Sequence, residues 1–229
     1  MIGFYDYTVI LTYLSLLSSV FGMTRAIHGD YKLAIFCLAF SGFCDCFDGK
    51  VARTKKNRSE DEKNFGIQLD SLCDVVCFGI FPALICYLLG MRGTFGMAIL
   101  FVYVICAVIR LAYFNVLEGK RQQIEEGSNS YYHGLPVTSI SIFLPLGFLM
   151  QFVMPENIFI LFLHCLMLMI GILFVMDFQV KKPGKKLLIV TIAVVSAALI
   201  VMFLYTRYRL PPVQDDPIMQ GILAEEYTS

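Results

Sequence analysis

Two aspartate-bearing segments decide the fold of this chain. One reads Cys44-Asp-Cys-Phe-Asp-Gly-Lys-Val-Ala-Arg53 and ends an apolar run; the other reads Gly66-Ile-Gln-Leu-Asp-Ser-Leu-Cys-Asp74 and begins the next. Asp45 and Asp48 are three residues apart, and Asp70 and Asp74 are four apart, so each pair shares a face if its segment is helical. A polar loop joins the segments, which predicts antiparallel neighbouring helices whose four carboxylates converge at one end.

The sequence around these segments is strongly apolar. Of the 229 residues, 58% are hydrophobic and 16% are charged, and the mean hydropathy is +0.71. In soluble domains about 45–50% of the residues are apolar and about 25% are charged. Runs long enough to cross a bilayer lie near residues 8–27, 31–50, 67–90, 94–117, 135–153, 157–177 and 187–206. These features predict an all-α, polytopic bundle of about six to seven transmembrane helices surrounded by membrane lipids.

Positive charge is concentrated on one side of the predicted membrane. Basic residues cluster in or beside the loops 54–65, 118–130 and 181–186, and few lie in the alternating loops. With seven spans these three loops share one side, which the positive-inside rule makes cytoplasmic. We therefore expect an integral, multi-pass cell membrane protein whose aspartates face the cytoplasm. The net charge of the chain is zero, and no nucleic-acid partner is expected.

The loop before the third apolar run allows two interpretations. Ser59 and Glu62 have the spacing of a capping box, which would start the third helix one or two turns before the membrane. Alternatively, the loop is a solvated charged segment without helical structure.

Four converging carboxylates require positive charge nearby. Each costs roughly 2.5–3.5 kcal/mol at the centre of a membrane helix, and the four repel one another. Divalent cations neutralise them most simply, and hard oxygen ligands favour Mg²⁺ or Mn²⁺. Two ions in one site can stabilise both the attacking and the leaving oxygen in phosphoryl transfer. The alternative is a set of boundary ion pairs with Lys50, Arg53 and Arg110.

Taken together, the two segments form the pattern Asp45-x2-Asp48-Gly49-x2-Ala52-Arg53 followed by Gly66-x3-Asp70-x3-Asp74. This pattern resembles the signature of the CDP-alcohol phosphatidyltransferase family. Within the family, residues 69–83, 110–115 and 131–136 are most similar to the CDP-diacylglycerol–serine O-phosphatidyltransferases. Tyr113 stands where those enzymes have a second arginine. The loop 54–65 is longer than usual by about one helical turn, and extra length in a loop costs little.

The resemblance implies transfer of a phosphatidyl group from CDP-diacylglycerol to L-serine, with release of CMP, by a homodimer. It also implies a site with two divalent ions and roles for particular residues. The implied metal ligands are Asp45, Asp48, Asp70 and Asp74, with Asp74 also the general base. The implied CDP-lipid site consists of Asp45, Gly49, Ala52, Arg53 and Gly66. We expect one membrane-embedded catalytic domain over residues 1–210, with its active-site core at about 35–136, and a poorly ordered polar tail over 211–229.

The acceptor site is less defined by the sequence. Arg110 and Asn115 are candidates, because a guanidinium can bind the serine carboxylate through two hydrogen bonds. Arg110 can alternatively be a boundary arginine that reaches along the lipid to water. The same chemistry with glycerol phosphate or inositol phosphate as acceptor also stays open. A divalent-cation transporter is a further alternative, although its acidic residues would be expected near mid-membrane on broken helices.

Overall fold

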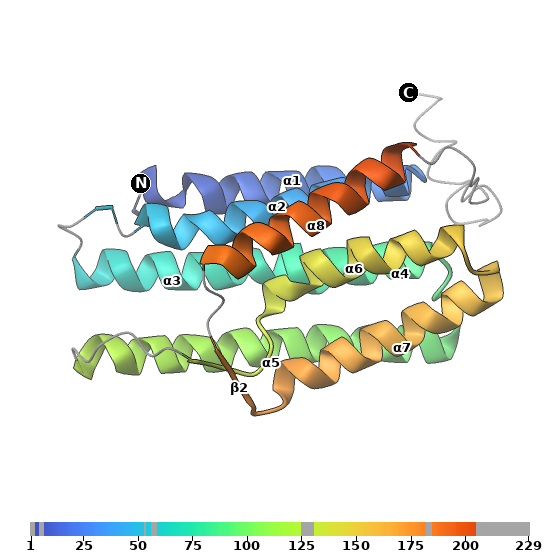
Figure 1. Ribbon diagram of the computed structural model, residues 1–229. Helices are drawn as coiled ribbons and strands as arrows, with labels where there is room; N and C mark the ends of the chain where they lie inside the picture. The colour runs from blue at the N-terminus through green and yellow to red at the C-terminus, as the bar shows by residue number, and fades with distance from the viewer. Residues whose placement is uncertain are drawn as a thin grey trace, which may run out of the picture.

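The computed structural model describes residues 3–4, 7–52, 54–55, 59–124, 131–181 and 185–204. In this part of the chain, long helices lie side by side along one common direction (Figure 1). The α-helices are α1 (Ile10–Ile27), α2 (Tyr31–Ala52), α3 (Glu60–Asp74), α4 (Phe81–Leu88), α5 (Thr94–Ile124), α6 (Ile140–Phe148), α7 (Glu156–Val175) and α8 (Lys185–Leu204). The predicted all-α bundle is confirmed. The predicted tail over 211–229 lies outside the described residues.

Four helical segments of the described chain are long and apolar enough to cross a bilayer. They are Tyr7–Ile27, Glu60–Leu88, Thr94–Gly119 and Glu156–Val175, and two shorter apolar segments are Val137–Phe152 and Leu188–Leu204. Large apolar side chains are exposed along these helices, as at Phe95 and Phe101 of α5, which suits a surface that faces lipid. Helix α2, which carries Asp45 and Asp48, packs against α1, α6 and α8 and also exposes three phenylalanines, Phe36, Phe40 and Phe43.

The third helical segment runs without interruption from Glu60 to Leu88. It consists of α3, a π-helix η2 (Val75–Ile80) and α4. Ser59 caps its start: the Glu62 N–H donates to Ser59 Oγ at 3.1 Å, and the Ser59 N–H donates to Glu62 Oε2 at 3.2 Å. Of the two interpretations of this loop, the capping box is therefore confirmed. The cap fixes where α3 begins and hence the register of its aspartates.

Small and hydroxyl-bearing residues hold α2 closely against its neighbours. Ser41 of α2 forms hydrogen bonds with Ser15 and Ser19 of α1, with Oγ–Oγ distances of 2.5 and 3.0 Å. Gly42 packs directly on Ser141, the second residue of α6, and a side chain at Gly42 would clash with it. Such residues let membrane helices approach and bond to one another. They fix the position of α2, which carries Asp45 and Asp48.

Two three-residue strands, which the sequence analysis did not predict, join the loops after α5 and α7. Strand β1 (Tyr131–His133) pairs antiparallel with β2 (Gln179–Lys181). Gly134 follows with a φ of +73°, and its N–H donates to the Phe178 carbonyl at 2.7 Å. A Cβ at this position would lie 2.8 Å from the Met176 carbonyl oxygen, so both the conformation and the space require glycine.

Candidate active site

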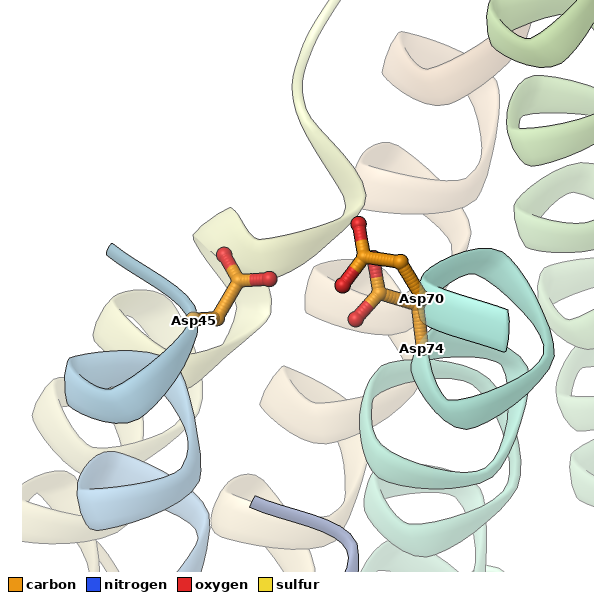
Figure 2. A group of neighbouring side chains, drawn as sticks. All are labelled: Asp45, Asp70 and Asp74. Carbon is orange, nitrogen blue, oxygen red and sulfur yellow. The ribbon is translucent and has the colours of Figure 1, made fainter. Parts of the chain in front are cut away.

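Three of the four aspartates meet between α2 and α3. Asp45 projects from α2, and Asp70 and Asp74 project from successive turns of α3 toward it (Figure 2). One carboxylate oxygen from each lies within 4.8 Å of the others. The three- and four-residue spacings place each pair on one face, and the antiparallel packing of the two helices brings the faces together.

Asp48 lies beside this group of three. It is one turn further along α2, and its carboxyl interacts with those of Asp70 and Asp45 and with the backbone of Gly49. All four sequence-predicted aspartates therefore interact electrostatically with one another.

The cluster concentrates negative charge in a partly desolvated place. Asp74 is 9% exposed, and the other three are partly buried. Ion pairs in the described part of the chain join Arg25 to Asp30 and Lys55 to Glu62, and neither pair involves these four carboxylates. An uncompensated buried charge costs several kcal/mol or more. Carboxylate oxygens at this spacing are suitable ligands for Mg²⁺ or Mn²⁺.

Asn115 connects the aspartate helix to α5. Ser71 Oγ donates to Asn115 Oδ1 at 2.7 Å, and Asn115 Nδ2 donates to Gln68 Oε1 at 3.4 Å. Both partners lie on α3, Ser71 directly after Asp70 and Gln68 two residues before it. Sequence analysis predicted Asn115 at the acceptor site, and the structure places its amide in contact with the helix that carries two aspartates. Nothing in the sequence indicated that Ser71 and Gln68 form hydrogen bonds with Asn115, apart from their position near Asp70.

Arg110 is buried inside the protein. It is 6% exposed, and its Nε donates to the Leu135 carbonyl at 3.2 Å, which links α5 to the loop that contains Gly134. The side chain also lines a cavity of about 320 Å³ together with Tyr113 and Asp177. This burial does not fit a boundary arginine that reaches along the lipid to water. Arg110 therefore contributes a cation to a cavity whose lining also includes the carboxylate-bearing residue Asp177.

The other described residues of the predicted CDP-lipid site lie on the same two helices as the aspartates. Gly49 is exposed on α2, Ala52 is the last residue of that helix, and Gly66 lies on α3 one turn before Asp70. Arg53 is outside the described residues. The described members of the predicted CDP-lipid site thus follow the two aspartate helices toward one end of the bundle.

Comparison with known proteins assigns this arrangement to a family. The model of the CDP-alcohol phosphatidyltransferases matches residues 8–210. The chain belongs to the CDP-alcohol phosphatidyltransferase family. Members of this family depend in general on divalent metal ions, and family membership together with the long apolar helices makes the chain an integral, multi-pass membrane protein. The expectation from the aspartate pattern is confirmed at the level of the family.

Several curated CDP-diacylglycerol–serine O-phosphatidyltransferases are similar to this member of the family. That of Saccharomyces cerevisiae is 37% identical over 131 residues, which cover 56% of this chain and 45% of the yeast protein. That of Mycobacterium tuberculosis is 30% identical over 145 residues, which cover 62% of this chain and 49% of the mycobacterial protein. That of Methanocaldococcus jannaschii is 27% identical over 184 residues, which cover 80% of this chain and 78% of the archaeal protein. The chain thus spans about half the length of the first two.

Proposed function

We propose that this protein transfers the phosphatidyl group of CDP-diacylglycerol to the hydroxyl of L-serine and releases CMP. The observation that carries the proposal is the convergence of Asp45, Asp70 and Asp74 from two helices in a chain of this family. The names of the similar curated proteins support serine as the acceptor. Family membership favours group transfer over the transport of a divalent cation.

Four aspartates would hold the metal in this proposal. Asp45, Asp70 and Asp74 supply the three close carboxylates, and Asp48 supplies a fourth beside Asp70. Bound Mg²⁺ or Mn²⁺, two ions in the full site, would neutralise the pyrophosphate and the charge that develops on the leaving CMP. The family resemblance assigns Gly49, Ala52 and Gly66 to the nucleotide, because small residues let a ligand approach the backbone, and it assigns Arg53 to the phosphates.

Asp74 is the proposed general base. Its carboxylate takes the proton of the serine hydroxyl as the oxygen attacks the phosphorus that bears the diacylglycerol. The new bond joins the serine oxygen to this phosphorus, and the bond from phosphorus to the CMP oxygen breaks. Asp74 is the most buried of the four, so a proton held there is shielded from exchange with water.

A product assay tests the proposal directly. Purified protein is incubated with CDP-diacylglycerol, Mn²⁺ and, in separate reactions, L-serine, glycerol 3-phosphate or inositol phosphate, and both CMP and the lipid product are identified. We expect phosphatidylserine and an equal amount of CMP. A lipid product formed from another acceptor would show that the acceptor is not serine, although the type of reaction would be unchanged. The absence of any CMP release would contradict the proposed reaction as a whole.

Arg110 is the proposed ligand of the serine carboxylate. Arg110→Lys keeps the charge and loses the planar fork that binds a carboxylate through two hydrogen bonds. We expect the KM for serine to rise about tenfold or more, on the order of one charge-assisted hydrogen bond, with a much smaller change in the KM for CDP-diacylglycerol. Arg25→Lys, at the helix end that pairs with Asp30, is the matched control. An unchanged serine KM would leave Arg110 the role of holding the Leu135 loop alone.

The aspartates are proposed to face the cytoplasm, where serine is dissolved. The basic loops 54–65, 118–130 and 181–186 support this orientation. A single cysteine at exposed Glu60, in a variant whose eight native cysteines are replaced, should react with an impermeant maleimide only after the cytoplasmic side is opened. Labelling of this cysteine in intact cells would show the opposite orientation and contradict the proposal.

Two further features belong to the proposal. We infer that residues 1–210 act as one membrane-embedded catalytic domain with its active-site core at about 35–136, and that the protein acts as a homodimer, as its family resemblance implies. In this proposal membrane lipids surround the bundle, and the CDP-lipid reaches the site by lateral diffusion in the bilayer.

A further inference from the structure

The helix that carries Asp70 and Asp74 changes its geometry directly after the second aspartate. Residues Val75–Ile80 form the π-helix η2, in which the Phe81 N–H donates to the carbonyl of Val76, five residues earlier. π-Helical turns are rare, and they frequently occur at functional sites. This one begins at the residue after a proposed metal ligand.

Pro82 explains why the helix widens here. In an α-helix the Phe78 carbonyl would accept from the N–H of residue 82, but proline has none, and its ring collides with that carbonyl. The Phe78 carbonyl instead accepts from the hydroxyl of Tyr103 on α5, at 2.6 Å. Tyr103 is fully buried, and Gly171 of α7 packs against its backbone. A side chain from another helix therefore replaces the missing backbone donor.

The widened turn changes which way the aspartates face. Asp74 and Phe81 are seven residues apart, so an uninterrupted α-helix would place them on nearly the same face. A π turn holds about one residue more than an α turn, which rotates one end relative to the other by roughly 100°. Phe81 is fully buried against Gly22 of α1, while Asp74 points toward Asp45 of α2 (Figure 2). The rotation allows both contacts.

We propose that Tyr103 is a positioning residue for the metal site: together with Pro82 it maintains the π-helix that turns Asp70 and Asp74 toward Asp45. Tyr103 lies on a different helix from all four aspartates and acts through the Phe78 carbonyl. The proposal rests on the proposed function only in assigning metal to the aspartates.

Two substitutions that weaken the π-helix in different ways test this role. Tyr103→Phe keeps the ring and removes the donor to Phe78. Pro82→Ala restores a backbone N–H for the same carbonyl and removes the steric cause of the π-helix, so it favours an uninterrupted α-helix. Tyr87→Phe on α4 is the control, since the Tyr87 hydroxyl has no hydrogen bond to another residue in the part of the chain that the structure describes.

The direct measurement is Mn²⁺ binding to the purified, full-length protein, followed by electron paramagnetic resonance, with thermal stability measured without metal. We expect Tyr103→Phe to weaken Mn²⁺ binding about three- to tenfold, the range of one hydrogen bond. Pro82→Ala should weaken it at least as much without any loss of thermal stability. Tyr87→Phe should bind Mn²⁺ like the unchanged protein.

A purely structural role for Tyr103 gives a different pattern. Tyr103→Phe would then lower thermal stability while Mn²⁺ binding stayed unchanged, and Pro82→Ala would also bind Mn²⁺ normally; this result would overturn the proposal. Absence of Mn²⁺ binding to the unchanged protein would also overturn the proposal. The binding assay needs no lipid or serine, so it is independent of the proposed reaction. If the unchanged protein binds Mn²⁺ but forms no phosphatidylserine, and both variants bind Mn²⁺ more weakly, the proposed reaction is contradicted and the positioning role of Tyr103 is supported.

Discussion

Asp74→Asn should lower turnover at least about a hundredfold while the protein still binds metal and CDP-diacylglycerol measurably. A positioned general base contributes typically about 10²–10⁴-fold to the rate. Asparagine keeps the size of the side chain and one oxygen ligand, but its amide cannot accept the serine proton. Turnover with L-serine and equilibrium binding of CDP-diacylglycerol in detergent micelles, measured on the same preparation, check the two halves of this expectation.

The comparison among all four Asp→Asn variants identifies the base. Variants at Asp45, Asp48 or Asp70, which are proposed as ligands alone, should lose metal binding and turnover together. The variant at Asp74, which is also the proposed base, should lose turnover far more than binding. Near-normal turnover in Asp74→Asn would remove this residue from the role of base. Intact binding with lost turnover in Asp70→Asn alone would transfer that role to Asp70, which lies one helical turn away on the same face.

The convergence of the aspartates could be predicted because it depends on local rules. Helical periodicity decides which residues share a face, and a connecting loop between two apolar runs makes them antiparallel neighbours. The start of α3 is equally local, since the Ser59 and Glu62 side chains cap their own helix. These short-range features placed Asp45, Asp70 and Asp74 correctly relative to one another before any tertiary contact was known.

The features that the sequence did not predict depend on partners distant in the chain. Pro82 inside an apolar run signals a disturbed helix, but only the fold shows that Tyr103 supplies the missing donor. Asn115 reaches Ser71 across 44 positions, and strands β1 and β2 pair across a whole helical hairpin. Three-residue strands are too short to show alternation. Arg110 likewise carries no mark in the sequence that distinguishes a buried arginine from one at the membrane boundary.

Asp45→Asn should weaken Mn²⁺ binding at least about a hundredfold and weaken CDP-diacylglycerol binding with it. Asp45 is the one member of the group of three that comes from α2, so its loss leaves both remaining close carboxylates on a single helix. Loss of an outer-shell partner of a metal ligand typically costs about 10–100-fold in affinity, and loss of a direct ligand should cost at least the upper figure. Mn²⁺ titration followed by CDP-lipid binding at fixed Mn²⁺ measures both effects.

Asp30→Asn is the matched control for this substitution, because Asp30 directly precedes the same helix at its opposite end. Fifteen residues separate it from Asp45, about 22 Å along α2, and its carboxylate contacts Arg25 at 2.9 Å and the Leu33 N–H at 3.3 Å. Its loss should cost some stability and leave Mn²⁺ binding unchanged. If Asp45→Asn also binds Mn²⁺ normally while Asp48→Asn does not, the ion is held by Asp48 with Asp70 and Asp74, and the α2 contribution to the site lies one turn nearer the end of the helix.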